Sequence, residues 1–227
     1  MGMAAVPPER AAGHEEWQRL CSGLLRGVRE PAGLGRALAA VTAAAEAACG
    51  ERPVACQAGC PACCVLNVAV LLPEAAVIAA WLAARAGPAS RPALLERLDG
   101  QRRRVRWMTD EERIHRQVAC SFLDPAGSCM IYPLRPLACR GVTSLDRDQC
   151  RAAFDPTEFD GPRAVPTDLV RRQAMEEAFR ALAGALEEVA MDSRSIELSA
   201  GVAAFVAKPE LGSDLLAGRR LPAGLWE

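Results

Sequence analysis

Residues 56–64 read CQAGCPACC, which places four cysteines within nine positions and makes the last two adjacent. Pro53 lies before this stretch and Pro61 lies inside it, and because proline disfavours a continuous helix we expect an irregular loop. Four more cysteines are spread further along the chain, at gaps of eight, nine and ten residues. Together these residues are Cys56, Cys60, Cys63, Cys64, Cys120, Cys129, Cys139 and Cys150.

The chain has ten cysteines but only two histidines, so any metal site built from these residues is dominated by thiolates. Thiolates are soft ligands that select zinc, cuprous copper or iron–sulfur clusters. Zinc ribbons pair two CxxC knuckles, and only Cys60 and Cys63 have that spacing here. A dense cysteine loop joined by distant cysteines is closer to iron–sulfur ligation, although spacing alone does not exclude zinc. We therefore expect the eight cysteines to hold an iron–sulfur cluster, of the [4Fe–4S] type, or zinc.

The adjacency of Cys63 and Cys64 limits how they bind metal. In an extended backbone neighbouring side chains point to opposite faces, so we expect that the two thiols do not both bind one small ion. Either they serve two centres, or one binds metal while the other packs; a multi-iron cluster relaxes this limit because it offers several metal corners. The two remaining cysteines, Cys21 and Cys49, lie on apolar helix faces, where free cysteine acts as a small hydrophobe.

The segments around the cysteines are rich in Ala, Leu, Arg and Glu and poor in aromatic residues, a composition that favours helix. The stretch 65–72 is short and apolar and fits either a strand or the start of a buried helix. SFLDPAGSCMIY, residues 121–132, predicts two short strands around a Pro-Ala-Gly turn. Apolar spacing and capping residues predict helices at 9–29, 34–49, 73–84, 92–108, just after Thr109, 167–191 and 196–206.

These elements predict a mostly α protein: an irregular helical domain with a cysteine-rich metal-binding centre and a short β-hairpin. We expect residues 1–50 to form an N-terminal helical segment and residues 51–165 to form the cysteine-cluster core. Residues 166–227 are expected to form a C-terminal helical segment that packs on this core.

The charge balance, 27 basic against 28 acidic residues, argues against a general nucleic-acid-binding or membrane-surface protein. The basic run QRRRVR, residues 101–106, fits a solvated helix face because no aromatic residues interleave with it to stack on bases. No secretory signal and no uncharged apolar run of about 18 to 20 residues is visible. We expect a cytoplasmic protein with no nucleic-acid and no membrane partner, and an unidentified protein partner remains open. In that reducing compartment the cysteines favour metal or redox chemistry over disulfides.

The chain resembles the YkgJ-type cysteine cluster family of zinc- or iron-chelating CxxCxxCC proteins in two cysteine stretches, CQAGCPACC (56–64) and CSFLDPAGSCMIYPLRPLACR (120–140), with Cys150 as the last cysteine of the set. In this chain the first gap of the loop has three residues rather than two. ELSAGVAAFV (197–206) resembles the helical tail of such proteins. The resemblance implies metal chelation, with an iron–sulfur centre favoured.

The sequence leaves open whether the protein is an enzyme. Some flagellin lysine N-methylases contain a similar domain, so the resemblance allows methyl transfer to a protein lysine. Cys56, Cys60 and Cys63 also have the spacing of the radical S-adenosylmethionine enzymes. However, Ala62 stands where those enzymes usually carry an aromatic residue, Cys64 follows at once, and the strand–helix alternation of a barrel is lacking. We expect a metal-binding protein with a structural, redox or sensing role; a lysine N-methylase-like or radical enzyme is the alternative.

Arg135 and Arg140 flank Cys139 and are the candidate residues that surround the metal ligands. Their positive charge can lower thiolate pKa values or offset the negative charge of a thiolate-bound cluster. The competing interpretation is that they bind backbone carbonyls or pair with Asp146 and Asp148.

Overall fold

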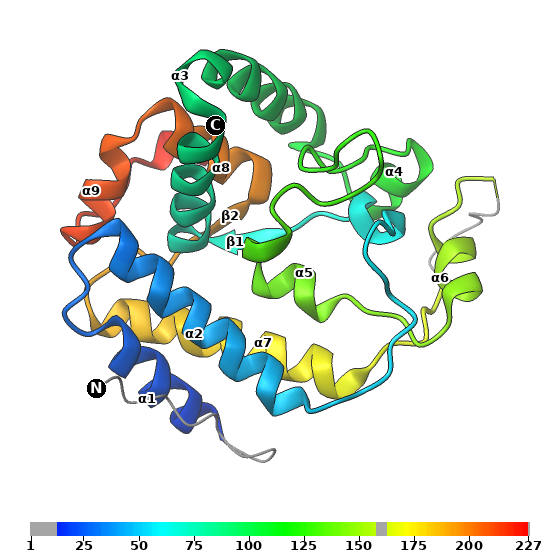
Figure 1. Ribbon diagram of the computed structural model, residues 1–227, viewed down its shortest axis with the longest axis horizontal. Coiled ribbons are helices and arrows are strands. Elements are labelled where there is room, and N and C mark those ends of the chain that lie inside the picture. Colours follow the sequence, from blue (N-terminus) through cyan, green and yellow to red (C-terminus); the bar gives the residue numbers. More distant parts are fainter. Residues whose placement is uncertain (1–12, 158–162, 227) are drawn as a thin grey trace.

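Three helices lie side by side along one edge of the molecule: α1 (His14–Leu25), α2 (Pro31–Cys49) and α7 (Leu169–Glu188) (Figure 1). The computed structural model describes residues 13–157 and 163–226. α7 packs against both α1 and α2, so a helix from the last third of the sequence lies in one layer with the two N-terminal helices. The expected helices 34–49 and 167–191 are confirmed with small shifts of their ends, and residues 9–12 of the expected first helix lie outside the described residues.

The second layer pairs α3 (Leu72–Val105) with α8 (Leu198–Ala207). α3 is bent at Gly87, whose φ of 68° and ψ of 170° are not helical, so it corresponds to the two helices expected over 73–84 and 92–108. Most of α8 is buried, as expected for a helix with apolar residues on nearly all sides. Two short elements that the sequence did not predict follow it, α9 (Glu210–Leu216) and η3 (Ala223–Trp226).

The sheet joins segments that are far apart in the sequence. Strand β1 (Ala69–Leu71) pairs antiparallel with β2 (Ser195–Glu197), with Val70 opposite Ile196. The hairpin expected over 121–132 is therefore wrong in its extent: in that segment one isolated bridge, Leu123 to Cys129, is formed within the described residues. For residues 65–72 the sequence allowed a strand or the start of a buried helix, and each is present in part. Residues 69–71 form β1, and α3 begins directly after it.

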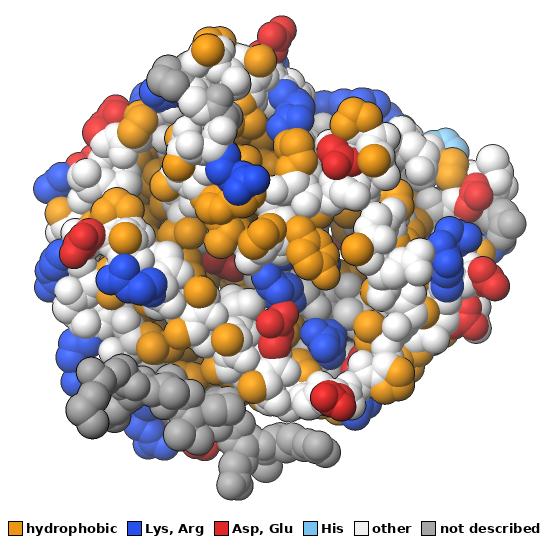
Figure 2. Space-filling view, in the orientation of Figure 1, with side chains coloured by type: hydrophobic (Ala, Val, Ile, Leu, Met, Phe, Trp, Pro, Cys, Tyr) orange, Lys and Arg blue, Asp and Glu red, His pale blue; other side chains and the backbone are white. Residues whose placement is uncertain are grey.

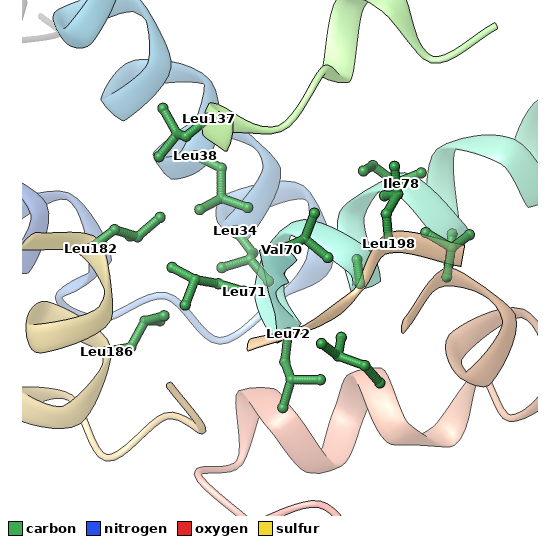
Figure 3. Packing of buried hydrophobic residues seen from close by; sticks show 14 of the residues in the cluster. Leu34, Leu38, Val70, Leu71, Leu72, Ile78, Leu137, Leu182, Leu186 and Leu198 are labelled. Carbon is green, nitrogen blue, oxygen red and sulfur yellow. The ribbon is translucent and has the colours of Figure 1, made fainter. Parts of the chain in front are cut away.

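The hydrophobic core lies between these layers. Leu34 and Leu38 of α2 converge with Leu182 and Leu186 of α7 around Leu71 of β1 (Figure 3). This one cluster of buried side chains contains residues from all three of the expected regions, 1–50, 51–165 and 166–227. The core thus fixes the position of β1 and α3, from which the cysteine-bearing segments extend.

The cysteine-bearing part of the chain consists of short elements joined by loops, and it lies on the opposite side of the molecule from α1 (Figure 1). The helix predicted just after Thr109 is α4 (Asp110–His115), and Thr109 and Glu112 form a capping box at its start. The mostly helical fold class is confirmed, and within the described ranges no helix has the length and apolarity that crossing a bilayer demands. The short elements are η1 (Ala62–Val65), α4 (Asp110–His115), η2 (Tyr132–Leu134), α5 (Leu137–Gly141) and α6 (Arg147–Ala153).

Candidate metal centre

The cysteine loop is held against the second cysteine segment by backbone contacts. The Cys120 N–H donates a 2.7 Å hydrogen bond to the carbonyl oxygen of Cys64. Gly59 and Gly127, both with φ near +80°, lie next to each other, and a Cβ on Gly127 would stand 3.7 Å from the Gly59 carbonyl oxygen. Glycine suits both positions because the backbone is left-handed and the two turns approach closely. The loop and the turn at 124–128 therefore form one unit.

The turn between Cys120 and Cys129 is organised by Asp124. Its carboxylate oxygen Oδ1 accepts the backbone N–H groups of Ala126 and Ser128 at 2.9 and 2.8 Å. This side-chain turn replaces part of the strand ladder that the sequence predicted, which explains why a single bridge forms there. Cys120 and Cys129, at the two ends of the turn, pack against the hydrophobic core.

Cys139 lies on α5, and Glu74 anchors the start of that helix. The Glu74 carboxylate, 8 % exposed as a residue, accepts the N–H of Leu71 at 3.0 Å and the N–H of Leu137 at 3.0 Å. Burial raises the pKa of Glu74, while the two backbone hydrogen bonds and Arg140 act in the opposite direction. Glu74 was not predicted as a site residue, because nothing in the sequence indicates that its carboxylate reaches Leu137.

Cys150 lies on α6 and meets the start of the cysteine loop at Ser144. The Ser144 N–H points to the Cys56 sulfur at 3.3 Å, and the Ser144 carbonyl oxygen accepts the Ala55 N–H at 2.8 Å. The Cys150 thiol is in hydrogen-bond contact with the same serine, which is 1 % exposed. Asp146 caps α6 by accepting two backbone N–H groups. Ser144 was not predicted as a site residue, and its position between Cys139 and Cys150 was the only available signal.

Cys63 and Cys64 differ from the sequence expectation. They lie on the 3-10 turn η1 rather than in extended backbone, and their thiols are hydrogen-bonded to each other. Because the Cys64 thiol donates to the Cys63 sulfur, the pKa of Cys63 is lowered and the pKa of Cys64 is raised. The premise that the two side chains point to opposite faces was therefore wrong.

Burial dominates the electrostatics of the other thiols. It raises the pKa of Cys120 to about 11 and the pKa of Cys150 to about 11, and it raises the pKa of Cys139 as well. The negative charges of neighbouring thiolates add to this effect: Cys129 acts on Cys120, and Cys63 acts on both Cys139 and Cys150. Seven of the eight thiols are half-buried and Cys56 is exposed. Such a group of sulfurs ionises together only when a cation balances their charge.

The two arginines have different surroundings. Arg135 donates to the Cys139 carbonyl oxygen at 2.6 Å and lies over the Tyr132 ring, and its charge lowers the pKa of Cys63, opposing burial. Arg140 pairs with Glu46 of α2 at 2.6 Å and donates to two backbone carbonyls. Both arginines thus bind backbone carbonyls. Within the described residues, neither forms an ion pair with Asp146 or Asp148.

The other cysteines and the histidines of the chain lie outside this region. Cys21 and Cys49 are 0 % and 1 % exposed in the core, as expected for small apolar residues, and burial raises the pKa of Cys21 to about 12. His14 contacts Glu177 on the opposite side of the molecule, and His115 is exposed at the end of α4.

The donor set fits a thiophilic metal, because all eight candidate ligands are cysteine thiols and seven of them are half-buried. Within residues 13–157 and 163–226, no three His, Cys, Asp or Glu side chains stand close enough together to hold one metal ion as they are placed. On the face shown in Figure 2, hydrophobic side chains, a class that there includes cysteine, gather around the middle of the molecule, with Lys or Arg side chains among them.

Comparison with known families agrees with this chemistry. Residues 55–156 match a family model described as "CxxCxxCC: Putative zinc- or iron-chelating domain". The match spans both cysteine groups and confirms the resemblance that the sequence suggested. No curated protein and no solved structure matches the chain.

Proposed function

We propose that this chain, whose residues 55–156 belong to the CxxCxxCC family, is an iron–sulfur protein that holds its metal through thiolates from both cysteine groups. The single observation that carries the proposal is the 2.7 Å backbone hydrogen bond between Cys120 and Cys64, because it joins the dense cysteine loop to the distant cysteines. Its expected ligands are Cys56, Cys60, Cys63, Cys64, Cys120, Cys129, Cys139 and Cys150.

The burial of these thiols supports a metal-binding role. Raised pKa values at Cys120, Cys139 and Cys150 mean that a thiolate at these positions is unfavourable without a cation. Binding of metal displaces the thiol protons and compensates the charge, so metal binding and folding of this region are coupled. A bound metal would link the cysteine loop, the turn at 124–128, α5 and α6.

Iron–sulfur chemistry is favoured over a single zinc ion by the number and kind of donors. Structural zinc is satisfied by four ligands, whereas this region offers eight thiols and the described histidines lie elsewhere. A cluster carries a net negative charge that is stabilised by nearby cations. Arg135 supplies such a charge beside Cys63, and Arg140 supports the same turn by donating to the carbonyl oxygen of Arg135 at 2.8 Å.

The role proposed is that of a metal-holding module with a structural, redox or sensing purpose in a reducing compartment such as the cytoplasm. The described sheet has two antiparallel strands, which is not the parallel barrel associated with radical S-adenosylmethionine chemistry. No contact in the described residues favours a methyl-transfer site, so the enzymatic alternatives stay sequence predictions.

The test is anaerobic purification followed by measurement of iron, zinc, acid-labile sulfide and the visible spectrum. We expect a brown protein with iron and sulfide in similar amounts. A colourless protein that carries zinc would support metal chelation but contradict the proposed iron–sulfur cluster. A protein that takes up neither metal, even after reconstitution with iron and sulfide or with zinc, would overturn the proposed function itself.

A further inference from the structure

A buried arginine connects the cysteine loop to the second cysteine segment, beside the backbone hydrogen bond from Cys120 to Cys64. Arg113 lies on α4, which contacts η1 (Figure 1). Its side chain donates to the Val118 carbonyl oxygen from Nε at 3.4 Å and from Nη2 at 3.1 Å, and its Nη1 donates to Oδ1 of Asn67 at 3.1 Å. Val118 is two positions before Cys120. Asn67 is three positions after Cys64, so one guanidinium joins the two cysteine segments.

The chain that leaves α4 folds back onto Arg113. The Val118 N–H donates to the Arg113 carbonyl oxygen at 2.9 Å, and the Gln117 N–H donates to the Ile114 carbonyl oxygen at 3.1 Å. Gln117 has a φ of 48°, the left-handed conformation with which such helix-ending turns are formed. Val118 is 0 % exposed and is bonded to Arg113 through both its N–H and its carbonyl oxygen. Arg113 therefore fixes the path of the chain into Cys120.

Asn67 is fixed on the loop side of the same contact. Its Nδ2 donates to the Met108 carbonyl oxygen at 2.9 Å, and its backbone N–H donates to Oδ1 of Asp110 at 2.6 Å. The remaining polar atom of its side chain, Oδ1, accepts Arg113. These bonds hold the end of the cysteine loop against the start of α4.

The burial of Arg113 indicates why an arginine occupies this position. The residue is 2 % exposed, and the acceptors of its side-chain hydrogen bonds are uncharged oxygen atoms. Among residues 13–157 and 163–226, no carboxylate forms an ion pair with it. Arginine is almost never this deeply buried unless it is paired, because removing its charge from water is costly. The planar fork of the guanidinium, however, can donate to two separate acceptors at once, which an apolar side chain of the same length cannot do.

We propose that Arg113 is a positioning residue of the metal centre, which holds Cys64 and Cys120 side by side by bridging Asn67 and Val118. The inference rests on the proposed metal-binding function and specifies how two of its expected ligands are brought together. The bridge and the 2.7 Å hydrogen bond from the Cys120 N–H to the Cys64 carbonyl oxygen close a ring of contacts around this junction. Loss of the bridge should let that hydrogen bond open more often and make it harder for both cysteines to reach one metal.

Hydrogen exchange at the Cys120 amide tests the bridge in the metal-free protein. In Arg113→Met, which removes the donors, exchange at this amide relative to the amides of α7 should be about 10–100-fold faster, as expected for loss of a hydrogen bond from a charged group. Ser22→Ala is the matched control, because it removes the 2.5 Å hydrogen bond from the Ser22 hydroxyl to Glu188, between α1 and α7. It should leave the ratio for Cys120 no faster. An unchanged ratio in Arg113→Met would overturn the bridge.

Affinity for Zn²⁺, measured by competition with a chelator, tests whether the bridge acts on the metal centre. Zinc serves as the probe because thiolates bind it readily. Arg113→Met should bind it about 10–100-fold more weakly than the unmodified protein, whereas Ser22→Ala should bind it equally well. Arg113→Lys keeps the charge but not the fork, so it should not restore the affinity. Full restoration by lysine, or unchanged affinity in Arg113→Met, would overturn the positioning role.

Asn67→Ala keeps the inference testable if the Arg113 variants fail to fold. It removes one end of the bridge and leaves the guanidinium in place, so it should change both readouts in the same direction but less. Unchanged exchange at Cys120 and unchanged affinity in Asn67→Ala would then overturn the inference. Absence of metal binding in the unmodified protein would instead overturn the proposed function, and hydrogen exchange would still decide whether Arg113 holds the junction.

Discussion

Glu74, in the first turn of α3, accepts the backbone N–H of Leu137 at the first residue of α5, with a distance of 3.0 Å between Oε1 and the nitrogen. The other carboxylate oxygen accepts the N–H of Leu71 at the same distance. One buried side chain therefore satisfies an N-terminal donor on two helices, the first packed in the core and the second carrying Cys139. This arrangement couples the stability of the core to the position of a proposed metal ligand.

Replacement of Glu74 by Ala should destabilise the protein and weaken metal retention. It leaves two buried backbone N–H groups without acceptors, and at about 1–3 kcal/mol per unsatisfied group the free energy of unfolding should fall by about 2–6 kcal/mol. Urea denaturation measures the stability, and metal content after dialysis measures the effect on α5. Glu112→Ala is the matched control because Glu112 accepts an N–H in the same way on the exposed helix α4, and its cost should be about 0.5–1 kcal/mol. Equal losses in the two variants would contradict the bridging role of Glu74.

The ion pair between the exposed Arg52 side chain and the buried Asp168 carboxylate should give stability a defined pH dependence. Asp168 is 1 % exposed, accepts Arg52 Nε at 2.7 Å, and caps α7 through the N–H groups of Val170 and Arg171. Burial acts to raise the pKa of Asp168, but these hydrogen bonds outweigh it and the pKa is lowered. The stabilisation is therefore complete above the ordinary aspartate pKa of about 3.9 and is lost as the pH falls through the lower folded-state value.

The experiment compares the unfolding free energies of the unmodified protein and Asp168→Asn between neutral and strongly acidic pH. The deficit of the variant should be largest near neutrality and should shrink as the pH falls below about 4. Asp214→Asn, which removes a solvent-exposed pair with Arg219, should show little deficit at any pH. A deficit in Asp168→Asn that does not change with pH would show that the charge of Asp168 makes no contribution.

The sequence identifies elements whose causes are local. The period of apolar residues predicts α2 and α7, the Thr109–Glu112 pair predicts the start of α4, and the cysteine spacing predicts a thiolate site. The family match confirms the metal-chelating class, while the individual ligands remain predictions. The helix signals are each contained within a few turns of the chain, whereas the cysteine signal extends from Cys56 to Cys150 and is read from residue type and spacing.

The features of the fold and of the site that could not be predicted depend on contacts between distant segments and on turn geometry. Val70 pairs with Ile196, and neither short apolar run specifies its partner, so the predicted hairpin was assigned instead to a segment that Asp124 folds into a tight turn. The orientation of Cys63 and Cys64 depends on a 3-10 turn for which adjacency alone gives no signal. Non-local pairing and turn geometry, rather than composition, therefore determine how the site is assembled.

The close approach of α3 and α8 requires Gly201. A Cβ at this position would stand 2.7 Å from Cγ2 of Ile196 and 2.9 Å from Cβ of Ala75, both well inside contact distance. Gly201→Ala should therefore lower the free energy of unfolding by about 1–3 kcal/mol through overpacking. Gly23→Ala is the matched helical control: nothing lies within 4 Å of its added Cβ, and the change should stabilise the protein by about 0.5–1 kcal/mol. Urea midpoints that move in the same direction for both variants would refute the packing explanation.

Arg135 and Arg140 should have different roles. Arg135 should act on the metal site through its charge, and Arg140 should mainly hold the fold together. The Arg135 charge acts on Cys63, Cys129 and Cys139, whereas the Arg140 charge acts on Cys129 alone of these three thiols and is paired with Glu46 at 2.6 Å. Arg135→Gln should weaken metal binding by about 10–100-fold, the usual effect of losing a group that supports the ligands. If the metal is a cluster, its reduction potential should also fall, because a positive charge favours the more negative reduced state.

Competition with a chelator measures the affinity, and redox titration measures the potential. Arg135→Lys keeps the charge but not the planar contact over Tyr132, so the potential should be partly restored. Arg140→Gln removes the link to α2 and should lower the stability more than the potential. If Arg140→Gln instead shifts the potential as far as Arg135→Gln does, the compensation by Glu46 is ineffective and both arginines act on the metal through their charge.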